Sequence, residues 1–349
     1  MLTPYVTAIA KPYLVFLADA ENPTLAKTAL GVRDWARKDC AGQLRLTPST
    51  LDIGLPDLTP SEAAARGARS LLIGVAPVGG QLPAAWQGVL LEALEAGLDI
   101  VSGLHVRLET FPALAEAAAR LGRTLHNVRH SKIAFPIATG RKRTGRRALM
   151  VGTDCALGKK YTALALTQAM RAEGIDATFR ATGQTGIMIS GSGIAIDAVV
   201  ADFIAGAAET LSPDAAPDHW DVIEGQGALF HPAYAGVTLG LLHGSQPDAL
   251  VLCHDPVRTV TSFFPNYPLP TIEAAITAYL PHAQRTNPAA RFVGISLNTS
   301  ALDEDAARRA IENAGARTGL PAFDPLRFGI AAVVDEMLAG TLEAAFAAV

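Results

Sequence analysis

The chain has 349 residues, of which 50% are apolar and 6% aromatic. This length suits two domains, or one large α/β domain, better than a single small core. The formal net charge of −4 excludes an overall basic field that would attract nucleic acid or an anionic membrane, so we expect small-molecule partners.

Cysteine usage and the N-terminal stretch indicate the compartment. Cys40, Cys155 and Cys253 are widely separated, and the sequence has no Cys-X-X-Cys pair or Cys/His cluster typical of zinc or of a disulfide framework. Lys11 and Pro12 interrupt the first apolar stretch, and no run reaches the roughly 18 apolar residues that a membrane span requires. We therefore expect a cytoplasmic protein with neither a signal peptide nor a membrane helix.

The first part of the chain alternates strand-like and helix-like segments. The apolar runs lie at 13–19, 70–77, 99–104 and 124–130, and the helical stretches at 22–38, 84–97 and 111–122. Asn22 would cap the first helix and Pro23 would open it. Since strand, helix and strand follow one another, we predict a Rossmann-like domain over residues 1–140, although no GxGxxG motif follows its first strand.

Residues 141–147, "RKRTGRR", form a dense basic stretch. Short charge runs are usually hydrated surface, so we expect a solvated linker between domains; the alternative is a role in holding an acidic ligand. An apolar strand begins directly afterwards, which places the start of the second domain at residue 147.

The second domain, 147–349, also alternates strands and helices. Its strand-like runs lie at 148–152, 177–183, 221–225, 249–255 and 291–298. Each is almost continuously apolar, as strands buried on both faces are, so we predict a mainly parallel sheet covered by helices. The fold class expected for both domains is α/β.

A glycine-rich loop, "VGTDCALGKKYTA", joins the first of these strands to a helix. Gly152 and Gly158 allow the backbone N–H groups to point inward, and the helix directs its positive end at the same spot. The loop therefore predicts an anion site, the alternative being an ordinary turn. The residues expected to hold the ligand are Gly152, Thr153, Asp154, Cys155, Ala156, Leu157, Gly158, Lys159, Lys160 and Tyr161.

Four segments in order resemble dethiobiotin synthetase and related nucleotide-dependent ligases. "GTDCALGKK" is similar to their "GTDTxxGKT" loop, "FRATGQTG" to their substrate loop, "VIEGQGAL" to the segment with a metal-facing Glu, and "VGISLN" to a strand ending in an Asn near the base. The resemblance implies a P-loop fold. Lys160, however, replaces the hydroxyl that holds Mg²⁺ in those ligases, and Thr162 should face another side of the helix, so we expect no metal.

Over its whole length the chain resembles the DgcN-type D-glutamate N-acetyltransferase family. The motifs are "VGTDCALGKKYTA", "RATGQTGIMISG", "EGQGALFHPAY" and "HGSQPDALVLCHDP". The resemblance implies acetyl transfer from acetyl-CoA to the amine of D-glutamate, in D-amino-acid breakdown with a partner dehydratase. Coenzyme A carries phosphates, so a P-loop can bind it without hydrolysis. We also expect a homo-oligomer. The alternatives are an ATP- or GTP-dependent ligase or kinase, and a non-catalytic nucleotide or CoA sensor.

The loop "EGQGALFHP" holds the candidate catalytic residues. Glu224 would orient or deprotonate the substrate ammonium, or else only bind loop amides. An imidazole is the side chain best suited to exchange a proton in the physiological pH range, so His231 is our candidate proton acceptor, with His254 as a further candidate; each could equally be structural. The N–H groups around Gly225–Gly227 could stabilise an oxyanion.

Substrate carboxylates call for arginine. Arg180, Thr182 and Gln184 lie in the predicted substrate loop, and Arg107 and Arg129 are weaker candidates in the first domain. The thiol of Cys155 lies near a helix N-terminus, where its pKa would fall, but direct attack by an amine on a thioester needs no acyl-cysteine.

Overall fold

The computed structural model describes residues 9–23, 25–75, 77, 80–131 and 133–347. The chain forms two compact units, an N-terminal unit of Met1–Ala134 with Gly183–Ala198, and a C-terminal unit of Phe135–Thr182 with Val199–Val349. This division differs from the expected domains 1–140 and 147–349. The basic stretch lies in the C-terminal unit, and the glycine-rich segment after Thr182 belongs to the N-terminal unit.

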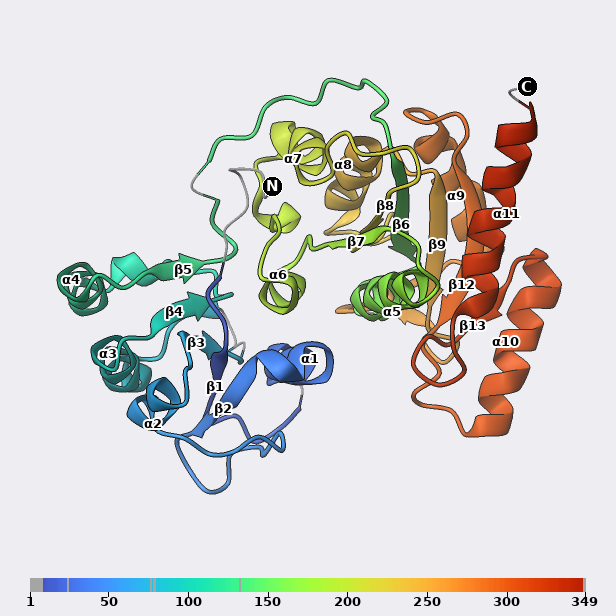
Figure 1. Ribbon diagram of the computed structural model, residues 1–349. Coiled ribbons are helices and arrows are strands. Elements are labelled where there is room, and N and C mark those ends of the chain that lie inside the picture. Colours follow the sequence, from blue (N-terminus) through green and yellow to red (C-terminus); the bar gives the residue numbers. More distant parts are fainter. Residues whose placement is uncertain (1–8, 24, 76, 78–79, 132, 348–349) are drawn as a thin grey trace. The chain divides into compact units, whose positions relative to one another are not determined.

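The N-terminal unit is a parallel sheet with helices on both faces, which confirms its Rossmann-like class. The strand order is β2-β1-β3-β4-β5. Helices α1 and α6 lie on one face and α2, α3 and α4 on the other (Figure 1). The strands are β1 (Tyr13–Ala18), β2 (Cys40–Arg45), β3 (Ser70–Ile73), β4 (Asp99–Ser102) and β5 (Leu125–Asn127). The helices are α1 (Lys27–Ala36), α2 (Pro60–Ala65), α3 (Gln87–Glu95), α4 (Pro112–Leu121) and α6 (Gln184–Ser190).

The first helix starts later than its sequence indicates. Asn22 does not cap α1, because its Oδ1 accepts the N–H of Leu25 at 3.1 Å in a separate turn, and α1 begins only at Lys27. The carboxamide thus satisfies a local turn instead of a helix end.

The C-terminal unit contains a second parallel sheet, in the order β13-β12-β9-β6-β8-β7. Helices α5 and α11 cover one face, and α7, α8 and α9 the other (Figure 1). The strands of this sheet are β6 (Arg146–Gly152), β7 (Ala177–Arg180), β8 (Trp220–Ile223), β9 (Ala249–His254), β12 (Arg291–Leu297) and β13 (Ala322–Phe323), and β10 (Val260–Thr261) and β11 (Phe264–Pro268) form an antiparallel hairpin. The helices are α5 (Lys159–Ala172), α7 (Ile204–Leu211), α8 (Ala235–Ser245), α9 (Ile272–Gln284), α10 (Glu304–Thr318) and α11 (Ala331–Ala347).

Short 3-10 helices complete both units: η1 (Arg37–Asp39), η3 (Ala84–Trp86), η4 (Leu108–Thr110), η5 (Ile196–Ala198) and η6 (Ala201–Phe203). Among the described residues, no helix combines the length and the apolar character needed to cross a membrane.

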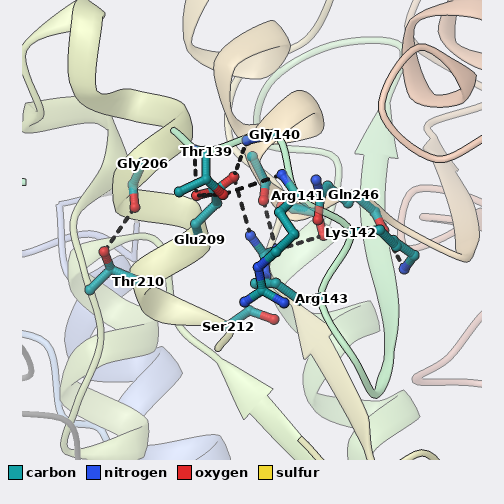
Figure 2. A network of polar contacts seen from close by, with 12 residues as sticks. Thr139, Gly140, Arg141, Lys142, Arg143, Gly206, Glu209, Thr210, Ser212 and Gln246 are labelled. Atoms are coloured by element: carbon teal, nitrogen blue, oxygen red, sulfur yellow. Dashed lines mark hydrogen bonds and ion pairs between the residues drawn. The ribbon is translucent and has the colours of Figure 1, made fainter. Parts of the chain in front are cut away.

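Two arginines of the basic stretch, Arg143 and Arg147, are buried, so the expectation of a solvated linker is wrong for them. Arg143 is 5% and Arg147 1% exposed. The guanidinium of Arg147 donates to several backbone carbonyls and, at 2.8 Å, to the hydroxyl of Ser212, while that of Arg143 donates to the carbonyl of Gly244. Figure 2 shows that Glu209 of α7 holds the residues directly before the basic stretch, because its carboxylate accepts the N–H groups of Thr139 and Gly140. Arginine serves here to bind carbonyl groups within the chain.

Strand β6 lies between β8 and β9, so the segments that follow these three strands meet at one edge of the sheet. The approach is close. A Cβ on Gly225, just beyond β8, would lie 1.7 Å from the carbonyl oxygen of Met150 in β6. Glycine at this position therefore allows the start of the loop after β8 to lie directly against strand β6.

Candidate functional site

The loop from Gly152 to Gly158 forms a nest of backbone N–H groups at the start of α5. Gly158 adopts φ +102° as the N-cap of α5, a conformation that favours glycine. Within the described part of the chain, the N–H groups of Ala156, Leu157, Gly158 and Lys159 donate no hydrogen bond. Unpaired N–H groups at the positive end of a helix bind phosphate or carboxylate oxygens. Phosphate binding by this loop stays a prediction.

Lys159 adds a positive charge from inside the protein. Its side chain is buried, and Nζ donates to the carbonyl oxygen of Asp154 at 2.7 Å. Burial lowers the pKa of this ammonium, because the charged form loses its hydration. An anion bound in the nest would compensate that charge.

Asp154 fastens the loop to the hairpin β10–β11. Its Oδ2 accepts the N–H and the hydroxyl of Ser262, both at 2.8 Å, and Nη1 of Arg258 at 2.9 Å. Burial alone would raise the pKa of this carboxyl, but these hydrogen bonds lower it, so Asp154 stays ionised. Arg258 also donates to the carbonyl of Cys155 at 2.7 Å. Sequence reasoning missed Arg258 and Ser262, which lie in a stretch without periodicity or a known motif.

Glu224 is held at the same edge by the predicted substrate loop. Its Oε2 accepts the N–H of Thr182 at 3.0 Å, and the hydroxyl of Thr182 donates to the Glu224 carbonyl at 2.6 Å. Gln226 in turn donates to that hydroxyl. In the described residues, the N–H groups of Gly225 and Gly227 donate no hydrogen bond, which leaves them available to an oxyanion.

His231 is buried, and both ring nitrogens are engaged. Nδ1 accepts the N–H of Ala233 at 3.1 Å, so the neutral ring carries its proton on Nε2, which faces the carbonyl of Ser262 at 3.3 Å. The ring stacks on Tyr234 with centroids 4.5 Å apart. To accept a proton, His231 has to release Ala233, so its role as the base stays a prediction.

The ligand atoms of Asp154, Cys155 and His231 lie within 4.8 Å of one another, a spacing that invites comparison with a metal centre. The donor set does not fit one. The Nε2 proton leaves no lone pair toward Asp154, whose Oδ1 lies 4.0 Å away, and Arg258 already neutralises the carboxylate. Burial also raises the pKa of the Cys155 thiol, contrary to the fall expected at a helix N-terminus, which disfavours a thiolate ligand or nucleophile.

Two further side chains support the loop. The hydroxyl of Tyr279 on α9 donates to the carbonyl of Gly152 at 2.9 Å and accepts the N–H of Leu229 at 2.8 Å, a connection that no sequence pattern indicated. His254 contacts the hydroxyl of Thr153 through Nδ1 at 2.9 Å, and burial lowers the pKa of its ring. His254 thus supports the loop from β9.

A cavity of about 370 Å³ opens beside the loop. Tyr161, Asn298 and Leu326 are among its lining residues, so it offers an aromatic ring, a carboxamide and an apolar wall. Lys160 lies with Nζ 4.7 Å from the centre of the Tyr161 ring. The hydroxyl of Thr162 is buried and hydrogen-bonded to that of Ser296 at 2.8 Å.

The predicted substrate residues do not gather in one unit. Arg180 pairs through Nε with Asp221 at 2.6 Å, an ion pair within the sheet, so its substrate role stays a prediction. Thr182 belongs to the C-terminal unit, and Gln184 begins α6 in the N-terminal unit.

Comparison with known proteins gives matches over nearly the whole chain. A D-glutamate N-acetyltransferase from Tritonibacter scottomollicae is 51% identical over 331 residues, 95% of this chain and 99% of the relative. One from a Pseudoalteromonas species is 47% identical over 326 residues, 93% and 98% of the two chains. The crystal structure of a DUF1611 family protein from Anabaena variabilis matches with a TM-score of 0.84 and 34% identity, covering 95% of this chain and 100% of the other.

Family models agree with the two kinds of domain. The model of a Rossmann-like domain of unknown function, DUF1611_N, matches residues 39–131, and that of a P-loop domain of unknown function, DUF1611, matches residues 136–334. These findings confirm the resemblance carried by the sequence motifs. The chain belongs to the DUF1611 family, in which a Rossmann-like domain precedes a P-loop domain.

Proposed function

We propose that this protein transfers the acetyl group of acetyl-CoA to the amino group of D-glutamate. The observation that carries the proposal is the name shared by two relatives, D-glutamate N-acetyltransferase, at 47% and 51% identity over nearly full length. D-Amino-acid breakdown in the cytoplasm, as a homo-oligomer, is part of the same proposal.

The features of the loop support acetyl-CoA as the donor. Coenzyme A carries a pyrophosphate and a 3′-phosphate, which the unpaired N–H groups and Lys159 suit. The adenine ring is flat and carries hydrogen-bonding edges, a match for the cavity with Tyr161 and Asn298. Lys160 takes the place of a Mg²⁺-binding hydroxyl, so the loop favours a phosphate ligand that is bound and not cleaved.

The reaction joins nitrogen to the acetyl carbon and breaks the carbon–sulfur bond. The substrate ammonium first loses a proton. We assign the role of proton acceptor to His231, and Glu224 orients the nitrogen. Attack produces an oxyanion, which the N–H groups of Gly225 and Gly227 would stabilise. Collapse of this intermediate breaks the carbon–sulfur bond and expels the CoA thiolate, which takes up the extra proton that the nitrogen loses, so that the products are the amide and free CoA thiol.

The test is to incubate the protein with acetyl-CoA and a panel of D- and L-amino acids and to follow free thiol. We expect thiol release with D-glutamate well above that with L-glutamate. Matched reactions with ATP and GTP, followed by phosphate release, test the ligase or kinase alternative. Phosphate release without thiol release would overturn the proposal, and inactivity in both assays would favour a sensor.

A further inference from the structure

A second cavity, of about 360 Å³, lies in the N-terminal unit at the carboxyl ends of its parallel strands. Gly103 and His105 follow β4, Gly80 follows β3, and Arg129 follows β5; Gln184 of α6 completes the wall. Ligands of α/β proteins bind outside the carboxyl ends of the strands, and this volume suits a small molecule. No residue of the loop from Gly152 to Gly158 is among the residues that line this cavity, so the proposed binding of acetyl-CoA at that loop does not assign a ligand to it.

The lining selects for an anion. The described residues that line this cavity include a guanidinium, a carboxamide and an imidazole, and none of these described residues carries a carboxylate. The side chain of Arg129 is 11% exposed and is held in one orientation, since Nε donates to the carbonyl of Gly103 at 2.8 Å and Nη1 to Asp197. Within the described ranges, Nη2 of Arg129 and the carboxamide of Gln184 have no hydrogen-bond partner. A fixed guanidinium edge beside an amide donor binds a carboxylate.

Glycines let the backbone approach this space. A Cβ on Gly103 would lie 3.0 Å from Cγ of Gln184, and a Cβ on Gly80, at φ +63°, would lie 2.5 Å from the ring of His105. Larger residues at either position would displace the side chains that face the cavity. The glycines thus keep Gln184 and His105 in place around it.

We propose that this cavity binds the carboxylate of a small amino-acid substrate through Arg129 and Gln184. This inference rests on the proposed function, because it assigns the acceptor of that reaction to the N-terminal unit. Asp197 offsets part of the Arg129 charge, so recognition relies on the fork geometry of the guanidinium as well as on charge. A lysine at position 129 would keep the ion pair with Asp197 but would lack the paired N–H donors of the guanidinium.

The experiment compares Arg129→Lys and Gln184→Ala with wild type and with a matched control, Arg45→Lys. Arg45 is also in the N-terminal unit and also paired with an aspartate, Asp57, but does not line this cavity. Three quantities are measured on the full chain: KM for D-glutamate, KM for acetyl-CoA, and the calorimetric Kd for glutarate, a dicarboxylate that cannot be acetylated.

We expect each cavity variant to raise KM for D-glutamate and Kd for glutarate by about 10-fold to 100-fold, the range for losing a hydrogen bond to a charged group. KM for acetyl-CoA should stay unchanged in both cavity variants. In the control Arg45→Lys, all three quantities should equal those of wild type. Folded cavity variants that bind glutarate like wild type, or a wild type that does not bind it, overturn the site. A wild type that binds glutarate through Arg129 but acetylates no D-glutamate instead overturns the proposed function and leaves the site standing.

Discussion

At the scale of single residues, the side-chain amine of Lys159 is buried, and burial lowers its pKa. Its contact with the Asp154 carbonyl positions the charge at the nest, where phosphate oxygens would replace lost hydration. We predict that Lys159→Ala weakens acetyl-CoA binding by about 10-fold or more, measured by calorimetry. Lys142→Ala is the control, because Lys142 is a partly buried lysine paired with Asp248, away from the loop. Equal affinity in wild type and a folded Lys159→Ala variant would remove the loop as the donor site.

His231 tests the assignment of the proton acceptor. His231→Ala should lower kcat by about 10² to 10⁴, the usual contribution of a general base, with little change in acetyl-CoA affinity. Part of the loss should return at high pH, where more substrate amine is unprotonated. His231→Asn keeps an acceptor for the Ala233 N–H but cannot take the proton, so it should be as slow as the alanine variant.

A normal rate in His231→Asn would mean that the ring only holds Ala233 in place. Glu224, whose carboxylate accepts the N–H of Thr182, would then be the next candidate for the proton acceptor. The pH profile separates the two outcomes, since a structural loss does not recover as the amine is deprotonated.

The sequence could identify the residues of the loop between β6 and α5 but not the partners that hold this loop in place. Gly158 and Lys159 were recognisable because spacing between a strand and a helix constrains them locally. Arg258 and Ser262 contact Asp154 across about a hundred positions of chain, and Arg180 turns to Asp221. Such contacts depend on which strands become neighbours in the sheet. No short pattern in a single sequence encodes that pairing.

At the scale of elements, the approach of the β8 and β6 loops depends on Gly225. We predict that Gly225→Ala lowers the free energy of unfolding by about 3 kcal/mol, because its Cβ would overlap the Met150 carbonyl and force the loops apart. Gly236→Ala on α8 is the control: its Cβ would meet nothing within 4 Å, so it should be neutral or stabilising by up to about 1 kcal/mol. Denaturant unfolding measures both. Equal stability of the two variants would contradict the close approach.

Strands with long apolar runs were predictable from the sequence, whereas β2 was not. The runs that became β1, β6 and β9 are buried along almost their whole length, which is why periodicity reveals them. Strand β2 reads "CAGQLR" and buries only its two middle residues, so it lacks that signature. Its position at the sheet edge comes from parallel pairing with β1, a long-range property.

At the scale of the whole molecule, the order of units along the chain departs from two consecutive domains. The segment Gly183–Ala198 belongs to the N-terminal unit although both of its neighbours belong to the other. Its glycine-rich sequence resembled a substrate loop, and composition gave no sign that it folds elsewhere. Tyr13 shows the physical reason, because its buried hydroxyl donates to the carbonyl of Met188 within this segment.

A metal requirement would be a property of the whole enzyme, and we predict none. Lys160 replaces the Mg²⁺-binding hydroxyl, and thioester aminolysis needs no metal to activate phosphate. Thiol release with acetyl-CoA and D-glutamate should therefore continue at an unchanged rate in EDTA. If chelation abolished turnover and Mg²⁺ restored it, the result would favour the ATP- or GTP-dependent ligase or kinase. Lys160→Thr would then be the next variant to make.

The most direct test of the central claim follows the acetyl group itself. Acetyl-CoA deuterated in its acetyl group is incubated with the protein and D-glutamate, and the products are identified by mass spectrometry. We predict N-acetyl-D-glutamate that carries the whole label on its amide, together with unlabelled CoA, and far less product from L-glutamate. Label that remains in acetyl-CoA while D-glutamate stays unmodified would contradict the account.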